Sequence, residues 1–543
     1  MLFRLPKAVT GPAVLRYQRA AADGAGRPLP VQRSSGSTSV EDYIRKILAA
    51  RVYDVAIESP LDPMRRLSGR LGSPVFLKRE DLQPVFSFKL RGAYNKMVGL
   101  DEEARAHGVI CASAGNHAQG VALAAKALGV KATIVMPRTT PDIKVQAVNA
   151  NGGDAVLHGD TFDEAYAHAK TLEAQTGAVF IHPYDDPQVI AGQGTIGMEL
   201  MRQHPDPLEA IFVQIGGGGL AAGVAAYVKF LRPDVKVIGV EPEDAASMTA
   251  ALAADERVKL NQVGLFADGV AVRQAGEETF RLCRQLLDGM ITVTTDEICA
   301  AMKDIFEDTR AIPEPSGAVS LAGLKKYVEQ HGPSQRGLIA INSGANLNFD
   351  RLRHIAERAE LGERREALFA VSIPEKPGSY RHFIRVLGAR AITEFNYRYA
   401  PAGEAQIFVG VQLTGGEAER KAVADLLRAE GYGVIDMSDN EMAKLHVRYM
   451  VGGRTPDLPN EMVYRFQFPE RPGALLKFLE SMAQTWNITM FHYRNHGADY
   501  GRVLAGIDVP PQERAEFAER LTALDYPCWD ETDNPAYRLF LAN

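Results

Sequence analysis

Residues 210–231 read AIFVQIGGGGLAAGVAAYVKFL, and this stretch decides the fold class. A β-branched apolar run leads into four consecutive glycines and then into an alanine-rich stretch. Residues 210–228 carry no charge over 19 positions, a length that could span a bilayer, but five glycines and Gln214 do not suit a membrane helix. The segment therefore predicts a buried strand, a tight glycine loop and a helix.

The same alternation continues from residue 41 to residue 346. GVICAS precedes HAQGVALAAKAL, and ATIVMP precedes PDIKVQAVNAN. Short strands that alternate with helices predict parallel sheets with crossover helices, which is an α/β architecture. Ligands in such folds bind at the carboxyl ends of the strands, so the loops after the strands are where chemistry is expected.

The composition is that of an ordinary globular protein. The 543 residues carry a net charge of −6, which argues against a nucleic-acid-binding coat. Four scattered cysteines and the lack of an HExxH motif predict neither a disulfide framework nor a zinc site. Residues 1–40 begin with basic residues and no acid, which is typical of an unstructured extension, the interpretation we favour, or of an organelle transit peptide. We accordingly expect a cytoplasmic protein, with a mitochondrion or plastid as the alternative.

An internal repeat begins after residue 361. IPEKPG, ITEFNYR and FVGVQL recur in the same order as FPERPG, ITMFHYR and LAGIDV, each 95 or 96 residues later. Each copy predicts a βαββαβ order, the plan of a ferredoxin-like α+β unit. We expect one unit at residues 366–440 and another at 461–540, either as a paired regulatory module or as an oligomerisation domain without a ligand.

Two glycine-rich loops follow predicted strands and precede predicted helices. They are SAGNHAQG at residues 113–120 and GGGGL at residues 216–220. The first turn of a helix presents free N–H groups and a positive dipole end, which hold phosphate or carboxylate, and glycine lets the backbone approach the anion. A rival interpretation is a dinucleotide-binding GxGxxA motif, formed by Gly217, Gly219 and Ala222 with Glu241 at the end of the next strand.

Lys89 follows apolar residues in VFSFKLRGA, residues 85–93. Burial beside apolar side chains lowers the pKa of an amine, because it disfavours the charged form. A neutral amine can form a Schiff base with an aldehyde cofactor. An isolated lysine is more often a surface residue, so the motifs around Lys89 must decide.

Seven motifs occur in a fixed order along the chain: KREDLQPVFSFKLRGA, SAGNHAQG, AGQGT, GGGGL, ADGVAV, EPSGA and SGAN. Together they resemble the pyridoxal-phosphate (PLP) enzymes of the tryptophan-synthase-β type, specifically the threonine/serine dehydratases. With two C-terminal ACT-like units, the chain beyond about residue 40 resembles the biosynthetic threonine dehydratases, or threonine ammonia-lyases. The resemblance implies the two-domain PLP fold over residues 41–355, with a smaller subdomain at about residues 90–185 inserted in the larger one.

The resemblance also implies roles for individual residues. Lys89 matches the lysine that binds PLP, and Phe88 matches the residue beside the pyridine ring. Asn116 matches the side chain that hydrogen-bonds the 3′-oxygen of the ring, and Ser343 matches the hydroxyl that faces the ring nitrogen. The implied phosphate cradle comprises Gly216, Gly217, Gly218, Gly219 and Leu220. The implied substrate residues are Ser113, Gly115, Asn116, His117 and Glu314, the last of which has a helix N-cap as its alternative role.

The implied reaction converts threonine to 2-oxobutanoate and ammonia, or serine to pyruvate, with Lys89 as the base. A neutral hydroxyl at Ser343 favours an unprotonated ring and therefore prompt loss of the β-hydroxyl. Isoleucine is the implied inhibitor and valine its antagonist, with Tyr397 and Tyr493 as candidate contacts or as core aromatics. The resemblance implies a homotetramer, and we expect no nucleic-acid or membrane partner.

Three other functions stay open from the sequence: a serine-preferring dehydratase or racemase, an amino-acid-sensing protein without activity, and an NAD oxidoreductase. Intact motif residues argue against the second. Some relatives bind a divalent cation through the glutamate of a GVEP segment and a downstream acid. Glu241 is present here, but Ser247 stands where that acid is expected, so we predict no metal site.

Overall fold

The computed structural model describes residues 39–543, apart from 139, 141, 160, 265, 375, 377, 399–403, 441–442, 445–457, 470–473, 483–484, 495–499, 525, 535–536 and 538–543. The extension expected at residues 1–40 lies outside the described residues up to position 38. The chain divides into two compact units, of which the first ends at Ala359 and the second begins at Glu360. Each unit is described by itself.

The larger sheet of the first unit has six strands in the order β1-β2-β10-β7-β8-β9. Neighbouring strands are parallel, except that β1 runs antiparallel to β2 at one edge. In sheet order the strands are β1 (Leu61–Pro63), β2 (Val75–Arg79), β10 (Gly337–Asn342), β7 (Leu208–Gln214), β8 (Lys236–Pro242) and β9 (Gly289–Val293). Central strands such as β7 are apolar on both faces, as parallel strands between two helical layers must be.

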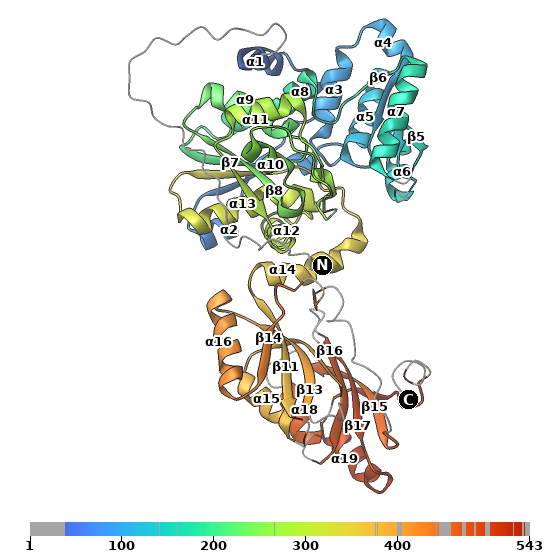
Figure 1. Cartoon of the computed structure of the whole chain (residues 1–543), viewed down its shortest axis with the longest axis vertical. Helices are drawn as coiled ribbons and strands as arrows, with labels where there is room; N and C mark the ends of the chain where they lie inside the picture. The colour runs from blue at the N-terminus through green and yellow to red at the C-terminus, as the bar shows by residue number, and fades with distance from the viewer. Residues whose placement is uncertain are drawn as a thin grey trace, which may run out of the picture. The chain divides into compact units, whose positions relative to one another are not determined.

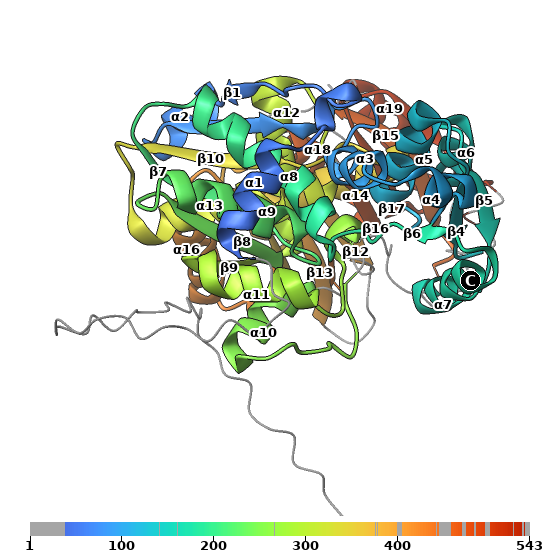
Figure 2. The same ribbon diagram turned by 90° about the horizontal axis from the view of Figure 1, so that it is seen from above.

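Helices cover both faces of this sheet. One face packs against α1 (Val40–Leu48), α8 (Pro187–Gln203), α9 (Gly219–Leu231) and α11 (Glu277–Leu286). Figure 2 shows α1, α8 and α9 side by side. The opposite face packs against α2 (Arg65–Leu71), α12 (Thr295–Thr309) and α13 (Pro315–His331). α10 (Ser247–Ala254) adds to the apolar core on the first face, and α14 (Leu352–Gly362) adds to the core on the opposite face. The predicted α/β architecture is confirmed.

The uncharged stretch that opened the sequence analysis forms β7, the glycine loop and α9, as predicted. Over the described residues, no helix combines the length and the apolar character needed to cross a membrane.

The smaller sheet of the first unit has four parallel strands in the order β5-β4-β3-β6. The strands are β5 (Asp154–Leu157), β4 (Ala132–Met136), β3 (Val109–Ala112) and β6 (Val179–Phe180). One face packs against α3 (Lys89–Val98), α5 (Asn116–Leu128) and α6 (Asp142–Ala150), and the other against α7 (Phe162–Thr176), while α4 (Glu102–His107) precedes β3. Figure 1 shows α5, α6 and α7 around these strands.

The second unit is one antiparallel sheet of eight strands in the order β14-β11-β13-β12-β16-β17-β15-β18. The first repeat runs β11 (Glu366–Pro374), α15 (Ser379–Leu387), β12 (Ile392–Arg398), β13 (Glu404–Gln412), α16 (Gly416–Ala429) and β14 (Gly433–Asp436). The second runs β15 (Glu461–Pro469), α18 (Ala474–Met482), β16 (Asn487–Arg494), β17 (Tyr500–Asp508), α19 (Arg514–Leu524) and β18 (Cys528–Asp530). The βαββαβ order predicted for each copy is therefore confirmed.

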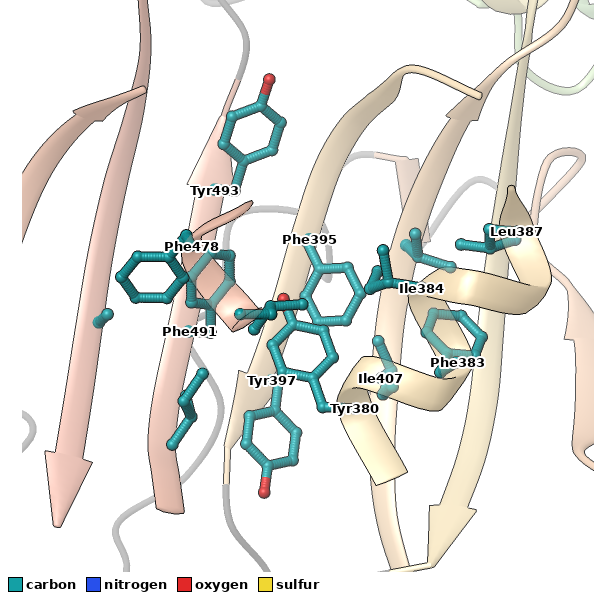
Figure 3. Close-up of a cluster of buried hydrophobic side chains, with 14 of the residues drawn as sticks. Tyr380, Phe383, Ile384, Leu387, Phe395, Tyr397, Ile407, Phe478, Phe491 and Tyr493 are labelled. Carbon is teal, nitrogen blue, oxygen red and sulfur yellow. The ribbon is translucent and has the colours of Figure 1, made fainter. Parts of the chain in front are cut away.

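The two copies join where β12 pairs with β16. Phe395 lies opposite Tyr493, and Tyr397 lies opposite Phe491. The helices α15, α16, α18 and α19 pack on the sheet around one large apolar core, to which both repeats contribute (Figure 1). In Figure 3 the aromatic rings of both copies meet at this junction, with Tyr380 of α15 beside Phe395 and Phe491. The two repeats therefore share one interior.

The repeat extends to a buried polar contact. In the first copy the hydroxyl of Thr393 donates to the carboxylate of Glu366, and in the second copy Thr489 donates to Glu461 in the same way. A β-carbon at Gly410, or at its equivalent in the second copy, would collide with the threonine hydroxyl. The duplication is thus preserved in side-chain contacts as well as in element order.

Candidate active site

Lys89 is the first residue of α3, and its side chain is half-buried. The ε-amine donates a hydrogen bond of 2.9 Å to the backbone carbonyl of Pro183 and lies 5.3 Å from the centroid of the Phe88 ring. Burial lowers the pKa of this amine to about 8, against the opposing influence of the Glu314 carboxylate. A substantial neutral fraction is therefore present near neutral pH, as nucleophilic or base chemistry requires.

The segment before Lys89 is tied to the end of β10. The N–H of Phe88 donates to the carbonyl of Ser343 at 3.2 Å, and the N–H of Ala345 donates to the carbonyl of Phe86 at 2.9 Å. Phe86 has a φ of 54°, a left-handed conformation that is strained for a bulky residue and is held here by these contacts. Ser343 is only 3% exposed. The structure therefore brings together Lys89 and Ser343, as the sequence implied.

The glycine loop lies at the same edge of the larger sheet. It follows β7, which is the parallel neighbour of β10, so the carboxyl ends of both strands meet there. Gly218 has a φ of 98°, and α9 begins at Gly219. The N–H groups in the first turn of α9 have no acceptor within the helix, which suits this turn to a phosphate.

The space beside each glycine is occupied by protein atoms. A β-carbon at Gly217 would collide with the ring of Tyr184, and one at Gly219 would lie 3.0 Å from the β-carbon of the same tyrosine. A β-carbon at Gly218 would lie 2.9 Å from the β-carbon of Thr279. The sequence analysis explained these glycines by the approach of an anion. The structure adds a second reason, because Tyr184 and Thr279 leave no room for a side chain at these positions.

Asn116, Glu314 and Asn346 form a hydrogen-bonded chain drawn from three distant segments. The amide of Asn116 donates to Oε1 of Glu314 at 2.6 Å, and Nδ2 of Asn346 donates to Oδ1 of Asn116 at 2.7 Å. Glu314 is 4% exposed, and its burial together with the charge of Asp268 raises its pKa to about 8. Glu314 stands at the N-cap position of α13, but its side chain makes no capping hydrogen bond and is directed to Asn116 instead.

The candidate carboxylate loop starts α5 at the carboxyl end of β3. The hydroxyl of Ser113 accepts a hydrogen bond from the N–H of Gly115 at 3.3 Å. His117 is buried, and its Nε2–H donates to the carbonyl of Ile181 at 2.8 Å. Burial lowers the pKa of His117 to about 3, so the ring is neutral. The His117 side chain anchors the helix, and the backbone N–H groups of the loop are the candidates for a carboxylate.

Two family models match this sequence. A model for pyridoxal-phosphate dependent enzymes matches residues 52–344, and a model for the C-terminal regulatory domain of threonine dehydratase matches residues 357–447 and 452–541. The biosynthetic L-threonine dehydratase of Burkholderia multivorans is 58% identical over 92% of this chain and 99% of that protein. The corresponding protein of Escherichia coli is 57% identical over 94% of this chain and 99% of its own length. The chain belongs to the biosynthetic threonine dehydratase family.

A solved structure agrees with this membership. The processed form of threonine deaminase isoform 2 from Solanum lycopersicum is 53% identical, with a TM-score of 0.58, and covers 61% of this chain and 97% of that one. The cofactor of the threonine dehydratase family is PLP, which decides against the dinucleotide-binding interpretation of the glycine loop. The residues present fit PLP, because a half-buried amine, a helix N-terminus and a buried hydroxyl meet at one sheet edge.

A buried ion network beneath Lys89 was missed by the sequence analysis. Arg91, two residues further along α3, is fully buried and donates to Glu80 at 2.8 Å and to Glu199 at 2.5 Å. The amine of Lys78 donates to the same Glu199 at 2.6 Å. The signal that could have revealed it is the run of charges in KREDL together with Arg91 in KLRGA, because these charges are close to Lys89 in the sequence. In this member of the threonine dehydratase family the network ties the Lys89 helix to β2 and α8.

Glu241 accepts hydrogen bonds from the start of α10. Its carboxylate accepts hydrogen bonds from the N–H groups of Met248 and Thr249, each at 2.8 Å, and from the Thr249 hydroxyl at 2.6 Å. Burial raises the pKa of Glu241 to about 7. Within the part of the chain that the structure describes, no cluster of three His, Cys, Asp or Glu residues is placed to hold a metal. Glu241 therefore caps the start of α10.

Tyr397 and Tyr493 lie on neighbouring strands, with their hydroxyl groups directed oppositely along the sheet (Figure 3). Tyr397 lines a cavity of about 20 Å³ between the repeats, together with Lys376 of the IPEKPG turn and Trp486 of the second copy. Such a volume holds one water molecule. Tyr380 also lines this cavity, and its buried hydroxyl finds no hydrogen-bond partner among the described residues. Most of the equivalent PERPG turn lies outside the described residues.

Proposed function

We propose that this chain is a PLP-dependent threonine ammonia-lyase that converts L-threonine to 2-oxobutanoate and ammonia, the first step of isoleucine biosynthesis. The observation that carries the proposal is the placement of Lys89. The Lys89 amine, whose pKa is lowered, donates a hydrogen bond to the carbonyl of Pro183. The next residue, Tyr184, packs on the glycine loop, and this loop lies beside the end of β10. The proposal places the catalytic region at residues 41–355 and the two regulatory units at 366–440 and 461–540.

PLP, when bound, supplies an electron sink that stabilises negative charge at the α-carbon of the substrate. Lys89 would hold the cofactor, and its free amine would take the α-proton of the substrate as a general base. Its pKa of about 8 keeps a useful fraction of the amine unprotonated at working pH. Phe88 would lie beside the pyridine ring, and the residues from Gly216 to Leu220 would hold the phosphate through backbone N–H groups.

Ser343 faces the ring nitrogen in this proposal. Its hydroxyl is neutral, so it does not enforce protonation of that nitrogen, and the negative charge that develops on the substrate is delocalised less strongly. Early departure of the β-hydroxyl is then favoured over transamination or racemisation. This argument supports elimination, and it ranks the racemase alternative second.

The substrate carboxylate is placed at the start of α5, against the backbone of Ser113, Gly115, Asn116 and His117. Asn116 also orients the 3′-oxygen of the cofactor, and its bond to Glu314 holds the amide in position. Glu314 retains a proton near neutral pH, because burial raises the pKa of this carboxyl to about 8. It can therefore donate a hydrogen bond to the substrate or the cofactor oxygen without adding a negative charge to the site.

The catalytic proposal is tested with the purified full-length protein. We expect the visible absorption of lysine-bound PLP, bleached by borohydride and absent from Lys89→Ala. Added threonine is expected to yield a 2-oxo acid, with kcat/KM for threonine above that for serine. A colourless protein after reconstitution with PLP contradicts the proposal, and a preference for serine selects the serine dehydratase alternative.

The second unit is proposed to sense amino acids at the junction of its repeats, with isoleucine as the inhibitor and valine as its antagonist. The cavity beside Tyr397 is the candidate site, and Tyr493 is the candidate in the second copy. A cavity that holds one water must open to admit isoleucine, so the closed and open forms bind the effector unequally, as allosteric control requires.

Effector control is tested by isoleucine titration of the full chain and of a chain truncated after Ala359, where the first unit ends. We expect the truncated enzyme to keep its PLP absorption and its activity but to lose inhibition by isoleucine. Tyr397→Ala and Tyr493→Ala in the full chain then assign the site to one copy or to both. Inhibition that survives truncation contradicts the proposal.

Two further properties are proposed from the family resemblance. We propose a homotetramer, which analytical ultracentrifugation tests directly. We also propose a cytoplasmic location, with a mitochondrion or plastid as the alternative if residues 1–40 act as a transit peptide. A fluorescent protein fused after the last residue, with and without residues 1–40, distinguishes these locations.

A further inference from the structure

The start of α11 donates two hydrogen bonds to the glycine loop. The carbonyl of Gly217 accepts a hydrogen bond of 2.6 Å from the hydroxyl of Thr279 and another of 3.3 Å from the N–H of Gly276. Thr279 is fully buried. A trans peptide is planar, so its carbonyl and the following N–H point in opposite directions. Anchoring the Gly217 carbonyl to α11 therefore turns the N–H of Gly218 away from α11.

Thr279 is itself held by a distant carboxylate. The N-cap residue of α11 is Gly276, which offers no side chain to the helix. Asp185 supplies the cap, since its carboxylate accepts from the N–H groups of Glu277 at 2.8 Å, Glu278 at 3.0 Å and Thr279 at 3.2 Å. A β-carbon at Gly276 would lie 2.5 Å from Cγ of Asp185, so this approach requires glycine.

The turn that carries Asp185 also carries the acceptor for Lys89. Two residues earlier, the carbonyl of Pro183 accepts the hydrogen bond from the Lys89 amine. Nδ1 of His182 closes the turn by accepting from the N–H groups of Tyr184 at 3.3 Å and Asp185 at 2.8 Å. Burial lowers the pKa of His182 to about 4, so its ring is neutral and can accept. One rigid turn thus connects the amine to the support of the glycine loop.

We propose that Thr279, held in place by Asp185, is a positioning residue for the phosphate of PLP. It fixes the peptide after Gly217 so that the N–H of Gly218 joins the first turn of α9 in facing the phosphate. Thr279 acts through the backbone and does not touch the cofactor. This inference rests on the proposed function, in which the glycine loop binds the phosphate.

The test compares Thr279→Val, which removes the hydroxyl, with Thr279→Ser, which keeps it. Apoprotein is titrated with PLP and, separately, with pyridoxal, which lacks the phosphate, and the Kd is taken from the absorption change. We expect Thr279→Val to bind PLP about tenfold more weakly, the usual effect of losing one buried hydrogen bond. Thr279→Ser should bind PLP as the wild type does, and the Kd for pyridoxal should be the same in all three proteins.

An unchanged Kd for PLP in folded Thr279→Val overturns the proposal. So does an equal loss of affinity for PLP and pyridoxal, which marks Thr279 as a structural residue only. If Thr279→Val does not fold, Asp185→Asn takes its place, with a several-fold loss for PLP alone expected and unchanged PLP binding overturning the proposal. Failure of the proposed function is recognised separately, because the wild type would then bind PLP no better than Lys89→Ala does.

Discussion

The ε-amine of Lys89 donates a 2.9 Å hydrogen bond to the carbonyl of Pro183, in surroundings that lower the pKa of this amine to about 8. We expect acetic anhydride to acylate Lys89 in the apoprotein with a midpoint near that pH, measured by mass spectrometry. Glu314→Gln should lower the midpoint, because Glu314, whose own pKa is also about 8, is partly ionised at this pH and its carboxylate favours the charged amine. The exposed Lys131 serves as an internal reference for the reagent. A midpoint near the ordinary lysine value of 10.5 would contradict this prediction.

Glu241 is expected to make the stability of the first unit depend on pH. Its pKa rises from 4.5 to about 7 on folding, so the folded state holds the proton more tightly than the unfolded chain does. This contribution to stability is complete below pH 4.5 and is lost as the pH rises through 7. Relative to Glu241→Gln, the wild type should lose on the order of 1 kcal/mol between pH 6 and pH 8. If the melting temperatures of the two proteins, measured by calorimetry, changed equally with pH across this range, the prediction would be wrong.

Ser343→Asp is expected to impair elimination. A carboxylate opposite the ring nitrogen would hold that nitrogen protonated and stabilise charge on the substrate, which delays loss of the β-hydroxyl. We expect kcat for threonine to fall by about tenfold, or about 1.4 kcal/mol in the barrier, together with a changed cofactor spectrum. Ser343→Thr, which keeps a hydroxyl, is the matched control. Unchanged turnover and spectrum in Ser343→Asp would refute the role assigned to this residue.

Arg91→Met is expected to destabilise the first unit strongly. It leaves Glu80 and Glu199 buried without their shared cation, and breaking a buried ion pair in this way costs about 3–5 kcal/mol. The control is Arg51→Met, which breaks an exposed pair with Asp54 and should cost about 1 kcal/mol or less. Chemical denaturation of the apoproteins measures both. Equal losses in the two variants would show that the buried network contributes no more than the exposed pair.

Tyr380→Phe is expected to stabilise the second unit. The substitution removes a buried hydroxyl for which the described residues supply no hydrogen-bond partner, and an unpaired buried polar group costs about 1–3 kcal/mol. Tyr43→Phe is the contrasting case, because the Tyr43 hydroxyl donates to Glu278 at 2.8 Å. Calorimetry should show a higher melting temperature for the Tyr380 variant and a lower one for the Tyr43 variant. A lower value for Tyr380→Phe would show that the hydroxyl is satisfied.

The sequence predicted those features of the fold that are written in local patterns. Alternating apolar runs and helical stretches gave the parallel sheets, and the repeated motifs gave two βαββαβ copies. The meeting of Lys89 with Ser343 and the glycine loop was predictable as well, because motifs at the carboxyl ends of parallel strands must share one edge. The pairing of β12 with β16 was not, since the packing of helices across the junction decides which strands become neighbours.

Individual hydrogen bonds and ion pairs between distant residues could not be predicted. Arg91 donates hydrogen bonds to Glu80 and Glu199, and the spacing of these residues in the sequence does not indicate that they are in contact. The support of Gly217 by Thr279 is equally hidden, because it depends on where α11 packs. The sequence therefore named residues for the chemistry but not the residues that hold them in place.

A shared interior across the β12–β16 junction has an evolutionary consequence. Neither half of the second unit could be excised without exposing rings such as Phe395 and Phe491, which shield one another. We therefore expect the two copies to be kept or lost together, because the loss of either one would expose the apolar surface of the other. In related sequences, we expect substitutions at positions of β12 that face β16 to be accompanied by compensating substitutions in β16.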